Sequence, residues 1–255
     1  MRRIAILLAA IGAAVLMSTT TGLAGSHPGD QPQAATIQQD RTLTVMTRNV
    51  YHGVDAEIAQ AAAAPTFDKF KEAATAVYYG YHQRHFPERA ELLADEIAAT
   101  KPDVIGLQEA VIVRTTPTAP LGDLEYLQIL RSALVARGLQ YEVAKEKINW
   151  DITVPTSEGF FLRHTDRIVM LVRTDADLKV LGTNSGDFQT NCTLPTAAPG
   201  VGPIKILRGW TSVDLSIRGK AVRLINTHLD GDCMDPPLIT PTFNSPRLGK
   251  FLRAR

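Results

Sequence analysis

The 255-residue chain has little net charge, few cysteines and no long apolar run after its N-terminal segment. A formal net charge of +1 excludes the strong overall positive field that draws many proteins to nucleic acid, although a local basic patch stays open. No later segment is apolar enough to span a bilayer. No internal repeat of fixed period indicates a solenoid or a propeller. The length therefore allows one large domain or two small ones.

The one long apolar run lies at the start of the chain. Arg2 and Arg3 precede apolar residues 4–17, and small residues follow them up to Ala24. This order is typical of a secretory signal peptide, and the run is shorter than the roughly 20 residues that a membrane anchor needs. We therefore predict cleavage and export, with no transmembrane segment in the mature chain.

These signals divide the chain into three parts. We predict a signal peptide at 1–24, a flexible polar leader at 25–41 and a single domain at 42–255, and we expect the mature protein to be secreted. Removing the two arginines of the signal peptide changes the formal net charge from +1 to −1. This charge argues mildly against long nucleic acid as a partner, because a protein that binds nucleic acid must neutralise its phosphates.

The two cysteines, Cys192 and Cys233, both lie in loop-like segments that contain proline and glycine. In an exported protein such a pair is expected to form a disulfide, and closing the loop between them would contribute roughly 4 kcal/mol to stability. Neither cysteine has a second cysteine or a histidine at the spacing of a metal site. We therefore favour a structural bond over a metal site or a nucleophile.

Helical and strand patterns alternate along the domain. Residues 87–100 place Ala90, Leu93 and Ile97 on one face, which predicts an amphipathic helix. The apolar run 104–107 follows at once and suits a strand buried on both faces, an order typical of an α/β layer. We further predict helices at 56–64, at 67–81 and from an N-cap at Asp123 to Gly138, strands at 43–48, 140–144, 167–173 and 178–182, a loop or an edge hairpin at 145–165, a long loop at 185–203, and a hairpin of 207–217 with 221–227.

Three polar residues stand where predicted strands end: Asn49, Glu109 and His228. Each has a structural explanation when it is taken alone, because an asparagine can cap a turn, a glutamate can lie at the surface and a histidine can hydrogen-bond a strand end. Ligands of open α/β sheets bind at the carboxyl ends of strands. An amide, a carboxylate and an imidazole at such ends therefore predict a site for a metal ion and a phosphate group.

The segments that carry these residues resemble the endonuclease/exonuclease/phosphatase superfamily, which includes DNase I-like nucleases, neutral sphingomyelinases and inositol-polyphosphate phosphatases. The matching segments are TRNV at 47–50, PDVIGLQE at 102–109 and NTHL at 226–229, in the order and spacing of that group. The resemblance covers roughly residues 43–229. It implies an α/β (α+β) fold, a four-layer αββα sandwich of two mixed β-sheets flanked by helices.

The resemblance also implies a chemistry. Glu109 matches the metal-binding glutamate, Asn49 the asparagine that orients the metal and the phosphate, and His228 a histidine that hydrogen-bonds the phosphoryl oxygen. The implied cofactor is Mg²⁺, with Mn²⁺ as an alternative. The implied substrate is a phosphoester, which could be nucleic acid, a sphingolipid head group or a small phosphoester, and no stable protein partner is implied. We therefore expect a secreted, metal-dependent phosphoric ester hydrolase.

The chain departs from the superfamily pattern after Leu229. An Asp-x-Asn motif and an Asp-His pair are expected there, and residues 230–255 contain neither. We therefore expect an incomplete domain that lacks its C-terminal strands, and losing the groups that position the attacking water should cost several orders of magnitude in rate. The alternative function is a non-catalytic exported domain that binds a phosphorylated or lipid ligand.

Several other residues have weaker claims on the site. Asp166 and Arg167 could place a cation near a phosphate, but an exposed ion pair would explain them equally well. Arg208 could add a basic contact, whereas Trp210 is expected in the core. His164 has no metal-ligand spacing to a second histidine. None of these residues is needed for the predicted set of Asn49, Glu109 and His228.

Overall fold

The computed structural model describes residues 42–229 of the 255-residue chain. The predicted signal peptide, the leader, Cys233 and the segment after Leu229 therefore lie outside the described residues, as does the side chain of Cys192. The predicted disulfide stays a prediction for this reason. Within 42–229, no helix combines the length and the apolar character needed to cross a membrane.

The described residues form four helices. Their buried faces follow the apolar spacing of the sequence: Phe70, Ala74 and Val77 are buried on the second helix, and Ala90 and Ile97 on the third. Thr66 caps the second helix by accepting a hydrogen bond from the backbone N–H of Lys69 at 3.2 Å. The helices are α1 Asp55–Ala63, α2 Phe67–Gln83, α3 Phe86–Thr100 and α4 Tyr126–Ala136.

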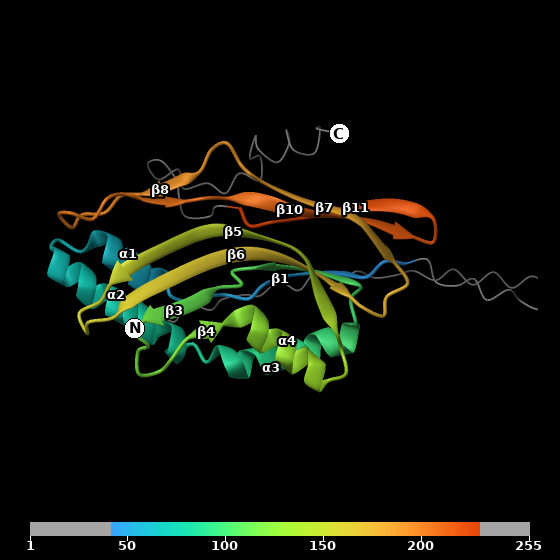
Figure 1. Ribbon diagram of the computed structural model, residues 1–255, viewed down its shortest axis with the longest axis horizontal. Coiled ribbons are helices and arrows are strands. Elements are labelled where there is room, and N and C mark those ends of the chain that lie inside the picture. Colours follow the sequence, from blue (N-terminus) through green and yellow to red (C-terminus); the bar gives the residue numbers. More distant parts are fainter. Residues whose placement is uncertain (1–41, 230–255) are drawn as a thin grey trace, which may run out of the picture. The chain divides into compact units, whose positions relative to one another are not determined.

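A six-stranded mixed sheet forms the centre of the structure (Figure 1). Strand β6 organises it, because β5 pairs along one edge of β6 while β2 and β3 share the other edge, all antiparallel. Strand β1 adds to β2 in parallel. The strands of this large sheet are β1 Val45–Asn49, β2 Val104–Gln108, β3 Ile112–Thr116, β4 Leu124–Glu125, β5 Tyr141–Pro155 and β6 Phe161–Arg173.

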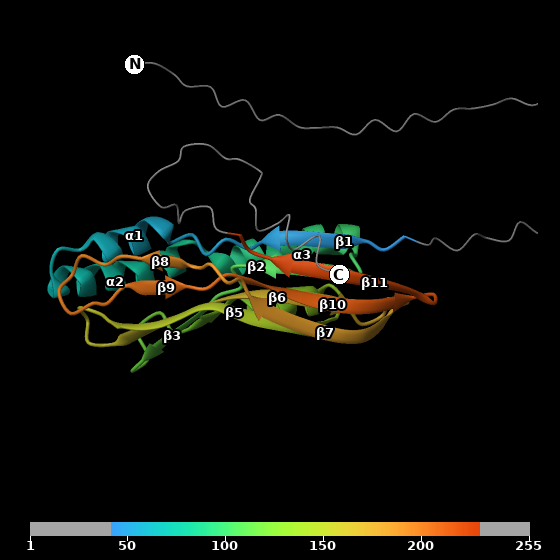
Figure 2. The same cartoon turned by 90° about the horizontal axis from the view of Figure 1, so that it is seen from above.

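A second, antiparallel sheet lies against the large sheet on the face opposite α3 and α4 (Figure 1). This small sheet has the order β11-β10-β7 and is built from β7 Lys179–Asp187, β10 Gly209–Ile217 and β11 Lys220–Thr227. A two-stranded hairpin, β8 Cys192–Leu194 with β9 Ile204–Ile206, projects beside α1 and α2 (Figure 2). The residues described thus form three layers, helices, large sheet and small sheet, which confirms the predicted α/β sandwich of two sheets flanked by helices. The small sheet is antiparallel rather than mixed, and the fourth predicted layer is not present among residues 42–229.

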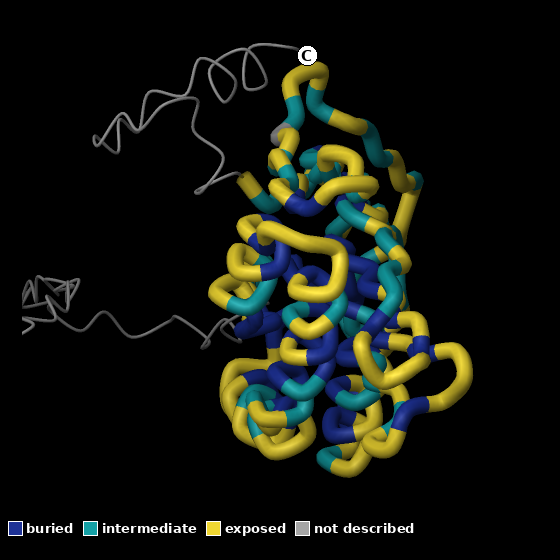
Figure 3. Tube along the Cα trace, turned by 90° about the vertical axis from the view of Figure 1, so that its left-hand side faces the viewer, coloured by how far each residue is buried: buried dark blue, intermediate teal, exposed yellow. Residues whose placement is uncertain are grey.

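The main core lies between the helices and the large sheet, and buried residues concentrate in the interior of the trace (Figure 3). Every residue of β2 is buried, as its unbroken apolar run predicts. Between the sheets, Asn226 of β11 donates to the carbonyls of Leu107 and Val169 at 3.0 and 3.1 Å. Gly106 permits this approach, because a Cβ there would lie 2.9 Å from Oδ1 of Asn226. A polar residue thus ties the small sheet to the large one.

Several predicted elements differ in the structure. Asp123 does not cap α4, whose N-cap is Glu125; it accepts hydrogen bonds from the backbone N–H and the hydroxyl of Thr115 instead. Of the two alternatives for residues 145–165, the loop over the site is wrong and the edge hairpin is right, since this segment belongs to β5 and β6. Strand β3 was not predicted, and the predicted loop at 185–203 contains β8 and the end of β7.

Candidate active site

Glu109 lies at the carboxyl end of β2, where the chain makes a sharp turn. Its φ of 59° is left-handed, a conformation that is uncommon for a residue with a side chain. The turn is held by a backbone bond from Ala110 N–H to the carbonyl of Arg167 at 3.1 Å. Strained backbone of this kind clusters at functional sites. Glu109 is 8% exposed and faces a cavity rather than bulk solvent.

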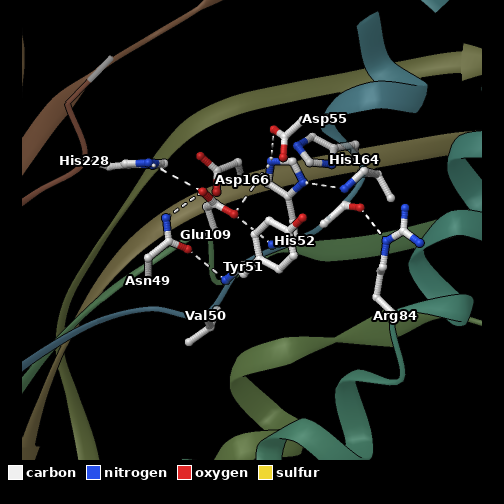
Figure 4. Close-up of polar contacts among 12 residues, drawn as sticks. Asn49, Val50, Tyr51, His52, Asp55, Arg84, Glu109, His164, Asp166 and His228 are labelled. Carbon is white, nitrogen blue, oxygen red and sulfur yellow. Dashed lines mark hydrogen bonds and ion pairs between the residues drawn. The ribbon is translucent and has the colours of Figure 1, made fainter. Parts of the chain in front are cut away.

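Asn49 ends β1, the neighbour of β2, and parallel pairing sets Asn49 opposite Gln108. Its Nδ2 donates to Oε1 of Glu109 at 2.6 Å, and its Oδ1 accepts from the backbone N–H of Tyr51 at 2.7 Å (Figure 4). The second bond fixes the orientation of the amide, so that its N–H₂ group is turned toward the carboxylate. Two strand ends therefore hold the predicted amide and carboxylate in contact.

His228 reaches the same carboxylate from the small sheet. Its Nε2 lies 3.5 Å from Oε1 of Glu109 (Figure 4). Its Nδ1 lies 3.1 Å from a guanidinium nitrogen of Arg208. Because arginine can only donate, Nδ1 accepts and the proton of a neutral His228 ring is on Nε2. The structure therefore brings the three predicted residues together, and it directs an N–H of His228 at the position of the carboxylate.

A second histidine, which sequence reasoning did not assign to the site, lies on the other side of Glu109. The backbone N–H of His52 donates to Oε2 of Glu109 at 2.7 Å. Its Nδ1 accepts from the backbone N–H of Val54 at 3.2 Å, which leaves the ring proton on Nε2. That nitrogen lies 3.4 Å from Asp55 and 3.8 Å from Glu109. The only feature of the sequence that pointed to His52 was its position just after the TRNV segment at 47–50.

Glu109, His228 and His52 line an open cavity of about 610 Å³ between β5, β6, the β8–β9 hairpin and the start of α1, and Asn49 reaches it only through its contact with Glu109. Asp166 of β6 lies in its wall and is 4% exposed. One Asp166 oxygen is 3.8 Å from Arg208, while Oδ1 has no hydrogen-bond partner among residues 42–229. The cavity lining consists of His52, Asp55, Ala56, Ile58, Ala59, Glu109, Trp150, His164, Asp166, Leu194, Ile206, Arg208, His228 and Leu229.

Burial and neighbouring charge set the ionisation of these groups. Burial alone would raise the pKa of Glu109, but His52, the Asn49 hydrogen bond and His228 together lower it below its ordinary value. Burial raises the pKa of Asp166, against the opposing pull of His228, His52 and Arg208. Burial and Arg208 lower the pKa of His228. At neutral pH the site thus combines an ionised Glu109 with a neutral, hydrogen-bond-donating His228.

His164 forms the buried floor of the cavity. Its ring stacks near Tyr81, whose hydroxyl hydrogen-bonds Nδ1, and near Trp150 at a centroid distance of 4.5 Å. Its Nε2 has no partner within the described part of the chain. Burial lowers the pKa of His164 to about 3, so the ring is neutral across the physiological range. No metal-ligand spacing marked this residue, and only the fold places it here.

Two neighbours on β6 proved to have separate roles. Adjacent residues of a strand point to opposite faces. Asp166 therefore enters the cavity, whereas the buried Arg167 forms ion pairs with the more exposed Glu125 and Glu146 on the other side. The exposed Asp166–Arg167 pair considered from the sequence is wrong for this reason. Trp210, expected in the core, is half-buried.

Oxygen donors dominate the part of the site that could hold a cation. Within residues 42–229 no group of three or more His, Cys, Asp or Glu side chains is arranged to hold a metal ion. A closed zinc site needs such a group, whereas Mg²⁺ is commonly held by one or two carboxylates and keeps several water ligands. The ionised Glu109 and the unpartnered Oδ1 of Asp166, which line one open cavity, fit the second kind of ion.

Comparisons with known proteins return structures with partial similarity to this chain. No protein-family model matches the chain, and no curated protein matches it. An endonuclease/exonuclease/phosphatase family protein from Leptotrichia buccalis is 12% identical with a TM-score of 0.40, and the alignment covers 84% of this chain and 62% of that one. An endonuclease/exonuclease/phosphatase from Beutenbergia cavernae is 22% identical with a TM-score of 0.35, over 73% and 38%.

A third structure is the mannosyl-6-phosphatase of Bacteroides thetaiotaomicron, 16% identical with a TM-score of 0.32, over 74% of this chain and 52% of that one. The chain thus spans less than two thirds of the length of each of these three proteins. Because these identities and TM-scores are low, only the geometry of the site bears on the function.

Proposed function

We propose that this chain carries the metal-binding half of a phosphoester hydrolase centre, with Glu109, Asn49 and His228 as its working residues. The observation that supports this most directly is the convergence of two N–H donors on one carboxylate oxygen: Nδ2 of Asn49 at 2.6 Å and Nε2 of His228 at 3.5 Å from Oε1 of Glu109. Donors that meet a carboxylate in the free protein are suitably placed for the oxygens of a bound phosphoryl group.

The metal would be held by the Glu109 carboxylate, with Asp166 as the second oxygen donor that the cavity offers. Mg²⁺ is the proposed ion, and Mn²⁺ is the alternative, because both prefer oxygen ligands. Such an ion supplies positive charge against the phosphoryl oxygens. Arg208 is the one arginine in the cavity lining, and without an added cation the three carboxylates there would oppose the binding of an anion.

The protein's own groups have distinct tasks in this proposal. His228 donates from Nε2 to a phosphoryl oxygen, and Arg208 holds the ring in the tautomer that allows this. Asn49, whose amide is fixed by Tyr51, orients the carboxylate and donates to the phosphate. Because burial and Arg208 keep the pKa of His228 low, this histidine acts as a neutral donor rather than as a standing positive charge.

The test is hydrolysis of bis(p-nitrophenyl) phosphate with Mg²⁺, combined with Mn²⁺ binding followed by electron paramagnetic resonance. We expect Glu109→Gln to lower the rate and the Mn²⁺ affinity by on the order of 100-fold or more. The matched control is Glu142→Gln, since Glu142 is an exposed carboxylate on β5. Thermal unfolding of all three proteins checks that the fold is kept.

The outcomes separate the candidate functions. Equal rates and equal Mn²⁺ affinity in the wild type and Glu109→Gln would refute the proposed centre. Metal binding that depends on Glu109 without any hydrolysis would favour the non-catalytic exported domain that binds a phosphorylated ligand. The proposal that the protein is secreted rests on residues 1–24 alone, and it is tested by the N-terminal sequence of the protein recovered from the medium.

A further inference from the structure

The cavity lining combines polar and apolar residues. Its polar part consists of Glu109, Asp166, Arg208 and the histidines. Its apolar wall is aliphatic and aromatic and comes from three elements, α1, β5 and the β8–β9 hairpin, and begins beside the polar part, because Trp150 pairs with Asp166 across β5 and β6. The apolar residues of this wall are Ile58, Ala59, Trp150, Leu194 and Ile206. A phosphate group alone would make no apolar contact with this wall. The apolar lining therefore indicates a ligand with a second, apolar part.

Two strands continue the apolar wall away from the site. On β5, Trp150, Ile152 and Val154 alternate and therefore share one face, and on β9 Ile204 and Ile206 share one face in the same way. All five are half-buried. Half-buried apolar side chains in two facing rows leave a strip that a hydrophobic ligand would finish covering. From Trp150 to Val154 the strip is roughly 13 Å long at the rise of a strand.

Two further hollows extend the site cavity along this strip. A narrow one of about 40 Å³ is almost entirely apolar and borders on Ile58, Trp150 and His164, all of which also line the site cavity. An outer groove of about 390 Å³ shares Trp150, Ile152 and Ile204 with the narrow hollow and opens beside Phe67. The three hollows are therefore neighbours along one line, here treated as a path, that leads from the site cavity to the surface beside the hairpin.

The hairpin that roofs this path is fastened on both sides of it. Ala197 donates from its backbone N–H to the carbonyl of Ala62 at 2.8 Å, and Leu207 donates to the carbonyl of Asn149 at 2.8 Å. Ala198 packs into the small cluster that contains Phe70. Because both ends are held, the apolar strip between them is a feature of the fold.

We propose that this path, here called the apolar channel and formed by Ile58, Trp150, Ile152, Ile204 and Ile206, binds a linear aliphatic chain of a phosphoester whose phosphoryl group lies at Glu109 and His228. This inference rests on the proposed function and narrows its substrate class. A nucleoside or sugar substituent is disfavoured, because the narrow hollow offers almost no polar partner. A planar aromatic ring is disfavoured, because the narrow hollow of about 40 Å³ takes only a thin segment of a ligand, such as a few methylenes of a linear chain that continues into the neighbouring hollows.

Binding of ethyl, butyl and octyl phosphate in the presence of Mg²⁺, measured by titration calorimetry, tests the channel. Each methylene that is fully buried should tighten binding about fourfold. We therefore expect octyl phosphate, below its micelle concentration, to bind at least about tenfold more tightly than butyl phosphate. Equal affinities for the three esters would overturn the proposal, as would tighter binding of phenyl phosphate than of octyl phosphate.

A filled channel provides the matched test. Ile204→Phe places a bulkier side chain at the junction of the narrow hollow and the outer groove, whereas Val180→Phe adds the same ring to an exposed position of β7. Ile204→Phe should abolish the gain from butyl to octyl phosphate and leave the ethyl phosphate affinity unchanged. Val180→Phe should change neither. If Ile204→Phe does not fold, Ile152→Ser is expected to reduce the same gain.

The results distinguish this inference from the proposed function. Ethyl phosphate binding that depends on Glu109 without any gain from chain length would keep the phosphoester centre and overturn the channel. A gain from chain length that survives Ile204→Phe and Ile152→Ser would place the chain elsewhere and overturn it too. Sedimentation with vesicles that contain phosphatidic acid identifies the source of the ligand: binding sensitive to Ile204→Phe indicates a membrane lipid, and octyl phosphate binding alone indicates a soluble ester.

Discussion

The two sheets carry different halves of the candidate site and are held in different ways. The large sheet supplies Asn49 and Glu109, and its strand β2 is buried on both faces under the helices. Among the residues described, the small sheet supplies His228 but contributes to the core between the sheets mainly through Val213 and Leu215. Its Val180, Leu181 and Ile225 stay 41–55% exposed.

The difference indicates which half of the site is fixed by packing. The main apolar core holds Glu109, because β2 is buried throughout and could not shift without opening it, whereas β1 has no buried residue and Asn49 is held by the parallel pairing of β1 with β2. His228 depends on a smaller apolar cluster and on the polar tie made by Asn226, two residues before it. We therefore expect the His228–Glu109 distance, rather than the Asn49–Glu109 contact, to respond to changes elsewhere in the protein.

The largest expected effect compares one leucine in each sheet. Leu107 and Leu215 are both fully buried, but Leu107 belongs to the main core and Leu215 to the small cluster. Leu107→Ala should lower the free energy of unfolding by about 4 kcal/mol, and Leu215→Ala by about 2–3 kcal/mol, because the thin cluster can close around the missing atoms. Urea denaturation measures both values. A cost for Leu215→Ala equal to that for Leu107→Ala would remove the contrast between the sheets.

The second prediction concerns the polar tie between the sheets. Asn226→Ala should leave the buried carbonyls of Leu107 and Val169 without their donor and cost about 2 kcal/mol. Hydrogen exchange should then speed up in β10 and β11 while β2 stays protected, because the small sheet opens first. Ser216→Ala, on the same strand pair, serves as the control and should leave exchange unchanged. Uniform loss of protection in both sheets would contradict the expected order.

The third prediction uses pH to test whether the floor of the cavity is dry. Burial lowers the pKa of His164 from 6.5 to about 3, so between these values an unfolded chain binds a proton that the folded chain does not. Acidification through this window should lower the free energy of unfolding, by up to about 1.4 kcal/mol per pH unit. His164→Gln lacks this proton, so its stability relative to the wild type should rise from pH 6.5 to pH 4. Urea denaturation measures the free energy of unfolding of both proteins. If the difference between them does not change with pH, water reaches the ring of His164.

The smallest expected effect lies on the exposed side of the small sheet. Arg223 and Asp214 form a two-point ion pair across β10 and β11, with both groups open to solvent. Exposed pairs of this kind contribute little, because water screens the charges and the side chains lose freedom. Arg223→Ala should therefore leave the denaturation midpoint unchanged within error at physiological salt. A clear loss of stability would mean that the small sheet depends on its surface more than on its core.

Much of the framework was predictable because its signals are local. The apolar spacing of Phe70, Ala74 and Val77 marks a helix face, and the run 104–107 marks a strand with no exposed side. Arg218 and Gly219 mark the turn between β10 and β11. Each of these signals depends on neighbours a few residues away. Folding does not change these local signals, so the helix faces, β1, β2 and the β10–β11 hairpin followed from the sequence, whereas β3 of the large sheet did not.

The candidate site was predictable only in part. Asn49, Glu109 and His228 stand at strand ends within recognisable motifs, and the structure brings them together. His52, Asp166 and Arg208 carry only weak local signals and belong to different parts of the chain. The N-cap prediction for Asp123 was wrong. Its residue type suits an N-cap, but in the fold its carboxylate accepts a hydrogen bond from the backbone N–H of Thr115 instead. The β8–β9 hairpin was missed because its strands are only three residues long.

The sequence by itself determined the alternation of helices and strands, the buried strand beside Glu109 and the three polar residues that end separate strands, since periodicity and residue type are properties of the chain. Only the tertiary structure decided that His228 meets Glu109 across two sheets, that Arg208 fixes its tautomer, and that an apolar strip leads away from the carboxylate. These features depend on the relative placement of segments that are distant in the sequence, from 20 residues apart for Arg208 and His228 to 119 for Leu107 and Asn226. No local pattern encodes such a distance, because long-range packing and hydrogen bonding set it.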